Sequence, residues 1–202
     1  MLDARLRRVI DPPLDRLAAS IEVSGLGANQ ATLIGFAVGV GAVVLIALEA
    51  YLAGLVLILL NRLFDGLDGA IARRGGPTDR GGFLDIALDF IFYASVPFGF
   101  ALAHPDANAL AAAFLILSFV GTGTSFLAFA IMAAKRGLST DLRGRKSLYY
   151  LGGLTEGTET LLAFVLACLV PGWFPAIAVA FGGLCWITTA TRFAVAWQML
   201  ED

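Results

Sequence analysis

Four aspartates lie near the ends of otherwise apolar stretches, where a carboxylate at bilayer depth costs several kcal/mol. Asp65 and Asp68 are spaced i,i+3, and Asp85 and Asp89 are spaced i,i+4, so each pair lies on one face of a helix. A short glycine-rich loop at 75–82 joins the two stretches and predicts that they are antiparallel neighbours. The four carboxylates then meet in one cavity, where they would repel one another unless cations balanced them. Two divalent ions would do so, and hard oxygen ligands suit Mg²⁺ or Mn²⁺.

The spacing alone leaves three interpretations of these carboxylates open. They could hold metal ions, they could form a proton relay in a transporter, or they could pair with arginines as structural salt bridges. The nearby arginines are Arg62, Arg73, Arg74 and Arg80. Small residues follow Asp68 on the same helix, at Gly69 and Ala72, and leave room for a group to approach the backbone closely. Since Arg73 could clamp a phosphate, a diphosphate held between Mg²⁺ ions and an arginine fits this set.

The composition predicts an all-α integral membrane protein and not an ordinary soluble domain. Hydrophobic residues make up 58% of the 202 residues, charged residues make up 15%, and the mean hydropathy is +0.82. A helix needs roughly 20 mostly apolar residues to cross the hydrocarbon core. Six stretches meet this requirement: 29–48, 51–72, 82–103, 107–134, 154–170 and 174–199. Cys168 and Cys185 fall within them and are expected to be buried hydrophobes. The net charge of −2 gives no indication of nucleic acid as a partner.

The placement of basic residues predicts how the six stretches are oriented. Lys and Arg gather before the first stretch, between the second and third, and between the fourth and fifth. They are Arg5, Arg7, Arg8, Arg16, Arg73, Arg74, Arg80, Lys135, Arg136, Arg143, Arg145 and Lys146. The opposite connections hold no Lys or Arg and offer Glu49, His104 and Asp106 instead. Because basic connections stay on the cytoplasmic side, both termini are expected in the cytoplasm.

The first 25 residues predict an amphipathic juxtamembrane segment ahead of a six-helix bundle at 29–199. Apolar residues recur at helical spacing from Leu2 to Ile21, and Pro12 and Pro13 predict a bend. The segment either lies on an anionic membrane face or packs on the bundle as a cap. Its early acids and prolines do not fit a cleavable signal peptide. With no internal repeat in the sequence, we expect 1–202 to form a single domain.

The two aspartate stretches resemble a family motif. They read D-x2-D-G-x2-A-R from Asp65 to Arg73 and G-x3-D-x3-D from Gly81 to Asp89. This order of eight fixed residues is similar to the signature of the CDP-alcohol phosphotransferases. The loop between the two halves is one residue shorter than is usual in that family, which leaves both aspartate pairs intact. The stretch at 146–157 also resembles a bacterial inner-membrane subgroup of the family.

The resemblance implies a fold and an activity. Members of the family have six membrane helices, an N-terminal cytoplasmic juxtamembrane helix and commonly a homodimer. They transfer a substituted phosphate group from a CDP-alcohol to an acceptor alcohol, release CMP and serve phospholipid biosynthesis. The resemblance therefore implies a CDP-linked lipid donor, here CDP-diacylglycerol, and a small alcohol acceptor. It also implies two Mg²⁺ or Mn²⁺ ions and a place in the inner (cytoplasmic) membrane of a bacterium.

The resemblance also implies a role for each matching position. Asp65, Asp68 and Asp85 would hold the metal ions, and Asp89 would contact metal and act as the general base. The implied donor-binding positions are Gly69, Ala72, Arg73, Thr78, Gly81, Asn29 and Thr32. One departure is Ala28, which stands where family members often have a proline.

Polar residues of the later stretches are candidates for binding the acceptor. They are Lys135, Lys146, Glu156 and Arg192. A buried Arg192 could hold an anionic group such as a phosphate or a carboxylate. Glu156 could favour an amine, or could pair with Lys146 and Arg192. The identity of the acceptor stays open.

Two other functions fit part of the sequence. The spacing of Asn61, Asp65 and Asp68 partly resembles membrane prenyltransferases, which hold a prenyl diphosphate through Mg²⁺ and aspartates. Those enzymes need a second, distant aspartate-rich motif and more membrane spans. A small transporter with an acidic cation or proton site is the non-enzymatic alternative, and it predicts acids spread along a path across the membrane. Here the acids gather at one depth, which favours the phosphotransferase.

Overall fold

The computed structural model describes residues 12–20, 25–137 and 154–200, and the described residues form helices without a strand. Residues 12–20 are helical, and the following helices are α2 (Ala28–Ala47), α3 (Tyr51–Gly75), α4 (Asp79–Ala103), α5 (Pro105–Lys135), α6 (Gly157–Leu169) and α7 (Phe174–Met199), with a 3₁₀ turn at Pro171–Trp173. The predicted all-α class is confirmed. Each helix lies within a few residues of its predicted stretch. Helix α6, which corresponds to the stretch predicted at 154–170, begins at Gly157.

Four helical segments of the described chain are long and apolar enough to cross a membrane: α2, α4, α5 and residues 171–199. Two predicted spans do not reach this standard. In α3, the C-terminal half carries the acids and arginines of the motif, which lower its hydropathy. In α6, the helix has only 13 residues, whereas roughly 20 are needed for a crossing. The chain is an integral membrane protein by these helices, and the count of six spans is not confirmed.

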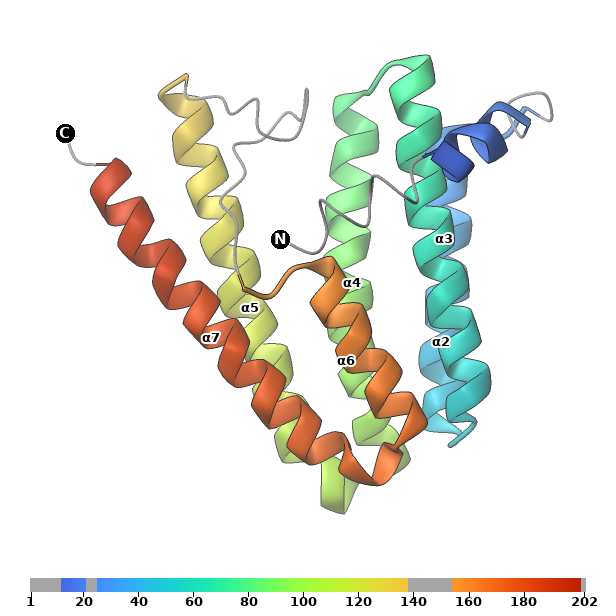
Figure 1. The fold of residues 1–202 in the computed structure, drawn as a ribbon, viewed down its shortest axis with the longest axis vertical. Helices are drawn as coiled ribbons and strands as arrows, with labels where there is room; N and C mark the ends of the chain where they lie inside the picture. The colour runs from blue at the N-terminus through green and yellow to red at the C-terminus, as the bar shows by residue number, and fades with distance from the viewer. Residues whose placement is uncertain (1–11, 21–24, 138–153, 201–202) are drawn as a thin grey trace.

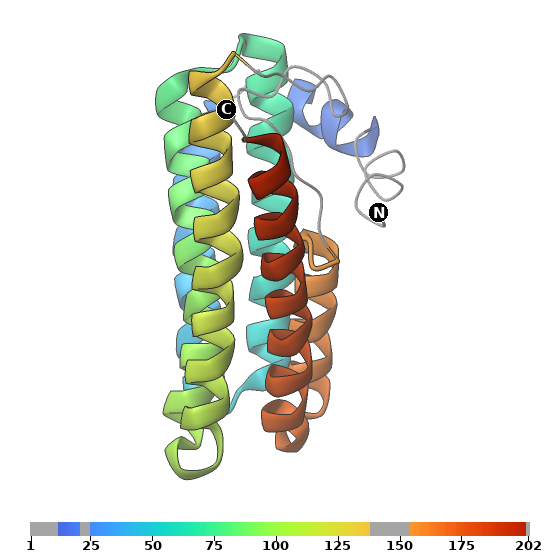
Figure 2. The same cartoon turned by 90° about the vertical axis from the view of Figure 1, so that its left-hand side faces the viewer.

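The helices run nearly side by side along the long axis of the molecule (Figures 1 and 2). Helix α2 packs against α3 and α4, α4 packs against α5, and α5 packs against α7, while α6 contacts α3 and α7. The turn between α3 and α4, the end of α5, the end of α7 and the helix at 12–20 lie at one end of the bundle (Figure 1). The connections from α2 to α3, from α4 to α5 and from α6 to α7 lie at the other end. Helix α6 begins partway along the bundle.

Glycines on α2 let this helix approach its two neighbours closely. A Cβ atom added at Gly35 would lie 2.7 Å from the Cβ of Phe64 on α3, and one at Gly39 would lie 2.6 Å from the Phe92 ring on α4. Neither distance is tolerated between real carbon atoms. Only glycine therefore permits the contacts that hold α3 and α4 against α2, and with them the two aspartate pairs.

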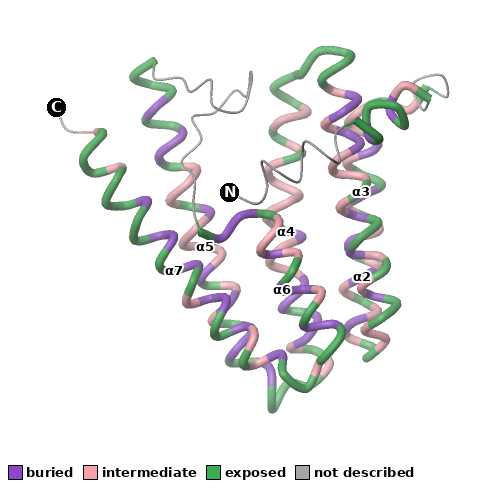
Figure 3. The backbone as a smooth tube through the Cα atoms, viewed as in Figure 1, coloured by how far each residue is buried: buried purple, intermediate pink, exposed green. Residues whose placement is uncertain are grey.

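The outer surface of the helices is apolar, as expected for contact with lipid. Large hydrophobic side chains are strongly exposed along the helices, including Leu52 on α3, Leu110 on α5 and Phe193 on α7. Exposed and buried positions alternate along each helix, so that one side of each faces outward (Figure 3). The core between helices is rich in aromatic side chains, and the rings of Phe100 and Phe174 stack with their centroids 4.4 Å apart.

The described part of the N-terminal segment packs on the bundle. Leu14 and Ala18 of the helix at 12–20 are buried against Ala31 of α2 and Leu67 and Ala70 of α3. The interfacial arrangement was the favoured prediction, and the packed cap, its alternative, fits these described residues. The residues before 12 lie outside the described part. Both cysteines are buried and free, as predicted.

Candidate metal centre

Three of the four predicted carboxylates form one cluster. Asp65 and Asp68 of α3 and Asp85 of α4 each offer an oxygen, and these oxygens all lie within 4.8 Å of one another. Because α3 and α4 are joined by a three-residue turn at 76–78, they run antiparallel and bring the two halves of the motif together. Oδ2 of Asp68 is buried and has no hydrogen-bond partner in the described structure. A buried carboxylate oxygen without a donor fits a cation ligand, so these residues suit Mg²⁺ or Mn²⁺.

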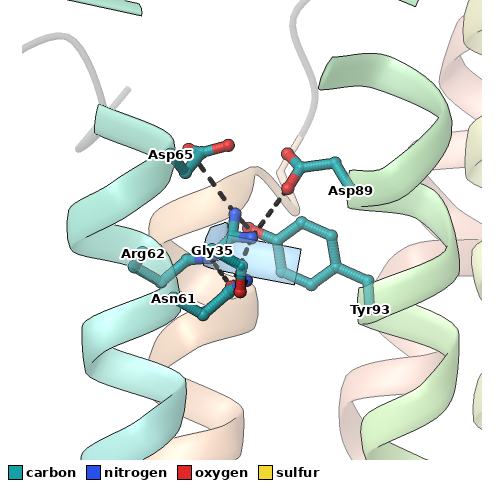
Figure 4. A network of polar contacts seen from close by, with 6 residues as sticks. All are labelled: Gly35, Asn61, Arg62, Asp65, Asp89 and Tyr93. Carbon is teal, nitrogen blue, oxygen red and sulfur yellow. Dashed lines mark hydrogen bonds and ion pairs between the residues drawn. The ribbon is translucent and has the colours of Figure 1, made fainter. Parts of the chain in front are cut away.

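Asp89 lies beside this cluster and is bound by an arginine. Oδ1 of Asp89 accepts a hydrogen bond from Nη2 of Arg62 at 2.7 Å, and Nη1 of Arg62 lies 3.6 Å from Oδ2 of Asp65. The guanidinium thus sits between one aspartate of α3 and one of α4 (Figure 4). The other oxygen of Asp89 points away from it. The arrangement combines two of the interpretations that the spacing had left open, because a structural ion pair adjoins a candidate metal cluster.

Arg62 is itself held on every side. Its Nε and Nη2 donate to Oδ1 of Asn61 at 2.8 and 2.6 Å, and its Nη1 donates to the hydroxyl of Tyr93 at 3.0 Å. Asn61 in turn donates to the Gly35 carbonyl of α2 at 2.8 Å. The rings of Phe92 and Tyr93 each lie 4.8 Å from the guanidinium carbon. Sequence reasoning treated Arg62 only as a possible salt-bridge partner, although a lone basic residue three positions before Asp65 was a usable signal.

A small pocket lies over the acids. Its lining residues are Thr32, Gly35, Phe36, Asn61, Arg62, Asp65, Asp68, Asp85, Leu88 and Asp89. The pocket therefore joins Thr32, one of the candidate donor-binding residues, to all four predicted carboxylates. Its walls come from α2, α3 and α4.

Three more candidate donor-binding residues gather at the start of α4. Thr78 is the N-cap of this helix and accepts a hydrogen bond from the Gly81 amide at 3.1 Å. A Cβ atom at Gly81 would lie 3.1 Å both from Oγ1 of Thr78 and from Oδ1 of Asn29 at the start of α2. Asn29, Thr78 and Gly81, which are far apart in the sequence, thus lie within one small region.

The remaining donor candidates lie on the last turns of α3. A Cβ atom at Gly69 would meet only Nη1 of Arg73, at 3.5 Å, so the backbone there is open apart from a flexible side chain. Ala72 is partly buried. Nη2 of Arg73 lies 3.3 Å from Oδ1 of Asp15 in the helix at 12–20, and both side chains are about half exposed. Arg73 therefore faces the N-terminal helix at the rim of the site.

The acceptor candidates are distributed over three places. Arg192 is buried in α7 and donates to the Thr122 carbonyl of α5 at 2.9 Å. Glu156 is the buried N-cap of α6, while Lys135 is exposed at the end of α5. Lys146 lies outside the described residues. The start of α6 borders the acid site, because a Cβ atom at Gly157 would lie 3.5 Å from the Tyr93 hydroxyl.

The family of the chain follows from its similarity to known proteins. The model of the CDP-alcohol phosphatidyltransferase family matches residues 26–197, which is most of the chain and includes every described residue of the acid site. The chain belongs to this family. It is therefore a phosphatidyltransferase, the metal-dependent enzyme class that the motif resembled, and it releases CMP from a CDP-linked donor.

Relatives of this phosphatidyltransferase come from bacteria and archaea. Inner membrane protein YnjF of Escherichia coli is 58% identical over 192 residues, which cover 95% of this chain and 93% of that protein. The archaetidylinositol phosphate synthase of Methanothermobacter thermautotrophicus is 28% identical and covers 97% of this chain and 92% of its own. The first relative agrees with an integral protein of the inner membrane.

A solved structure shares the fold of this phosphatidyltransferase. The phosphatidylinositol phosphate synthase PgsA1 of Mycobacterium tuberculosis, in complex with manganese and citrate, matches with a TM-score of 0.71 and 24% identity, covering 91% of this chain and 88% of that chain. A second structure of the same protein, with CDP-DAG bound, matches with a TM-score of 0.66. At this identity the match establishes the arrangement of helices alone.

Proposed function

We propose that this phosphatidyltransferase moves the phosphatidyl group of CDP-diacylglycerol to a phosphorylated polyol and releases CMP. The observation that carries the proposal is the cluster of Asp65, Asp68 and Asp85, whose ligand oxygens lie within 4.8 Å of one another. A cluster of carboxylate oxygens of this kind suits divalent ions, and divalent ions bind a diphosphate. The family's reaction begins with such a donor.

The donor fits along the start of α2 and the facing ends of α3 and α4. The nucleotide would lie near Asn29, Thr78 and Gly81, because the side-chain oxygens of Asn29 and Thr78 both flank the Gly81 backbone. At Gly69 the backbone is open, so the donor could approach it closely. Arg73 is a cation at the rim of the acid site, where it could bind the diphosphate. The PgsA1 structure with CDP-DAG bound supports a diacylglycerol-linked donor.

The chemistry assigns distinct work to the acids. Asp65, Asp68 and Asp85 would hold the divalent ions, which, when bound, neutralise charge on the diphosphate. Asp89 would accept the proton of the acceptor hydroxyl through the oxygen that points away from Arg62. The acceptor oxygen then bonds to the phosphorus that bears diacylglycerol, the bond from that phosphorus to the bridging oxygen breaks, and CMP leaves. Positioning and charge stabilisation account for most of the acceleration in phosphoryl transfer.

The acceptor would approach from the side of α6 and α7. The start of α6 adjoins Tyr93 next to Asp89, and its polar surroundings include a hydrogen bond of 2.9 Å between the hydroxyls of Thr155 and Thr188. Arg192 lies one helical turn beyond Thr188 on α7 and supplies a buried cation that suits a phosphate. Two archaeal relatives carry the name archaetidylinositol phosphate synthase. A phosphorylated polyol is therefore the acceptor class we propose, with Lys135, Lys146 and Glu156 as further candidate contacts.

In the membrane, we propose six crossings with both termini in the cytoplasm and a homodimer as the assembly. The end of the bundle at which α3 turns into α4 carries Arg73, Arg74 and Arg80, while the opposite end offers Glu49 and His104, which lie 3.6 Å apart as an acid–histidine pair. The charge difference supports a cytoplasmic acid site. Membership of the phosphatidyltransferase family argues against the transporter and the prenyltransferase.

Product analysis with purified protein tests this function. Full-length enzyme in detergent, given CDP-diacylglycerol and Mn²⁺, would be offered inositol phosphate, glycerol 3-phosphate, inositol, serine and choline in turn. We expect CMP and a new lipid with a phosphorylated acceptor only. We also expect Arg192→Gln to raise the KM for that acceptor by about tenfold or more, the loss typical of a charge-assisted contact. Turnover with serine or choline alone would contradict the proposed acceptor class.

A further inference from the structure

Arg62 occupies the centre of the acid site, although it lies outside the family motif as it appears in this chain. Its side chain is only 14% exposed, and it contacts one aspartate from each half of the motif. Each of its three nitrogens is engaged, by Asn61, Tyr93, Asp89 and Asp65. A guanidinium bound this completely has one available orientation (Figure 4).

The fixed guanidinium in turn fixes Asp89. One oxygen of Asp89 is bound at 2.7 Å, which leaves the second oxygen pointing away from Arg62. Without this contact, a carboxylate on α4 that is 32% exposed could rotate about its side-chain torsions. The contact therefore determines which way the second oxygen of Asp89 faces.

We propose that Arg62 is a positioning residue for Asp89: it holds one oxygen of this carboxylate and so leaves the second oxygen available for the acceptor proton. The inference rests on the proposed role of Asp89 as the base. It assigns the Arg62 side chain, with Asn61 and Tyr93 as its supports, to the reaction as well as to the fold.

The charge of Arg62 gives the inference a readout that does not depend on turnover. A cation 3.6 Å from Asp65 repels a second cation that binds to the same carboxylate. Removing it should therefore strengthen metal binding. A residue that served only to hold the helices together would have the opposite effect, because loosening the site weakens metal binding.

Kinetics and Mn²⁺ binding on full-length enzyme in detergent test the inference. We expect Arg62→Gln to lower kcat by about 10²-fold or more, with the KM for CDP-diacylglycerol changed by less than about threefold. Titration of Mn²⁺ alone, followed by electron paramagnetic resonance, should show that Arg62→Gln binds Mn²⁺ at least about fivefold more tightly than wild type does.

Two further variants serve as comparisons. Arg62→Lys keeps the positive charge but loses the planar guanidinium that binds several partners at once, so kcat should fall without tighter Mn²⁺ binding. The matched control is Arg16→Gln, an exposed arginine of the N-terminal helix, which should match wild type in both assays.

A double-mutant comparison shows whether Arg62 acts through Asp89. In an Asp89→Asn background, Arg62→Gln should lower kcat by less than about threefold further, because the two changes remove one function. An undiminished loss in that background would overturn the inference, as would weaker or unchanged Mn²⁺ binding in Arg62→Gln. If the wild type releases no CMP with any acceptor, the proposed function fails by itself. The Mn²⁺ titration then still decides whether Arg62 is coupled to the acid cluster.

Discussion

The four aspartates of the motif have different partners at the residue level. Asp65, Asp68 and Asp85 bring their oxygens together, and the buried Oδ2 of Asp68 has no donor within the described structure. Asp89 instead receives a hydrogen bond from Arg62. Carboxylates in such different surroundings suit the different roles proposed for them, with the clustered acids as cation ligands and Asp89 as the proton acceptor.

Asp89→Asn should separate these two kinds of work. The amide keeps the size of the side chain but cannot accept the acceptor's proton, so kcat should fall by about 10²- to 10⁴-fold. The three clustered acids are unchanged, and Mn²⁺ should still bind. Turnover assays and Mn²⁺ titration on the same preparation would measure both. Wild-type turnover in this variant would remove Asp89 from the mechanism.

Two glycines in the site region should respond differently to the same small change. At Gly69 an added methyl group meets only the mobile end of Arg73. Gly69→Ala should therefore leave the melting temperature in detergent unchanged or higher, while it raises the KM for CDP-diacylglycerol by obstructing the backbone. At Gly39 the methyl group would lie 2.6 Å from the Phe92 ring. Gly39→Ala should cost about 1–3 kcal/mol of stability.

Thermal melting and donor kinetics on both variants would check this contrast. If Gly69→Ala destabilises the enzyme as strongly as Gly39→Ala does, the backbone at Gly69 is not open. If Gly69→Ala has the wild-type melting temperature and the wild-type KM for CDP-diacylglycerol, the donor-binding role proposed for Gly69 is wrong.

Residue types and spacing were sufficient to predict the acids but not their partners. The intervals from Asp65 to Asp68 and from Asp85 to Asp89 follow directly from helical periodicity, and the structure brings three of these four residues together. The role of Arg62 depends on the direction of its side chain and on the Tyr93 ring from another helix. Such a contact depends on how α3 packs against α4, and no interval within one helix encodes it.

At the scale of elements, the start of α4 combines a helix cap with the proposed donor-binding region. The Thr78 hydroxyl accepts the Gly81 amide, satisfying one of the unpaired donors at the helix start. The same hydroxyl and the Asn29 amide oxygen flank Gly81. The turn thus fixes the beginning of the helix that carries Asp85 and Asp89.

Thr78→Val should weaken both functions of this turn. Loss of the cap should cost about 1 kcal/mol of stability, visible as a lower melting temperature, and the KM for CDP-diacylglycerol should rise. Thr78→Ser keeps the hydroxyl and should retain both properties. If Thr78→Val and Thr78→Ser were indistinguishable in melting and in donor kinetics, the hydroxyl would have neither role.

The helices themselves were well predicted from hydropathy and from the breaks between apolar runs. The run at 51–72 and the helix Tyr51–Gly75 begin at the same residue, and so do the last run and α7. How far each helix crosses the membrane was less predictable. This property depends on the level along the bundle at which the helix begins. Helix α6 starts partway along the bundle and has 13 residues, which an apolar run at 154–170 does not reveal.

At the scale of the whole molecule, charge differs between the two ends of the bundle. Arg73, Arg74 and Arg80 lie at the end of the acid site, and Glu49 and Asp106 lie at the other. A donor and an acceptor that are made in the cytoplasm would reach the first end directly. The asymmetry is the basis of the orientation we propose.

Cysteine labelling would measure this orientation. In a Cys168→Ala, Cys185→Ala background, Arg80→Cys and Asp106→Cys place single thiols at exposed positions on opposite ends. With a membrane-impermeant maleimide on intact spheroplasts, we expect Asp106→Cys to be labelled and Arg80→Cys to react only after permeabilisation. The reverse pattern would place the acid site outside the cytoplasm.

Metal-dependent CMP release tests the central claim most directly. Purified enzyme with CDP-diacylglycerol and inositol phosphate should release CMP with Mn²⁺ or Mg²⁺ and stop when EDTA is added. Asp68→Asn should lower the rate by about 10²-fold or more, because it removes a ligand from the cluster. Asp106→Asn, an exposed aspartate at the opposite end, should match wild type. CMP release that survives both EDTA and Asp68→Asn would contradict the account.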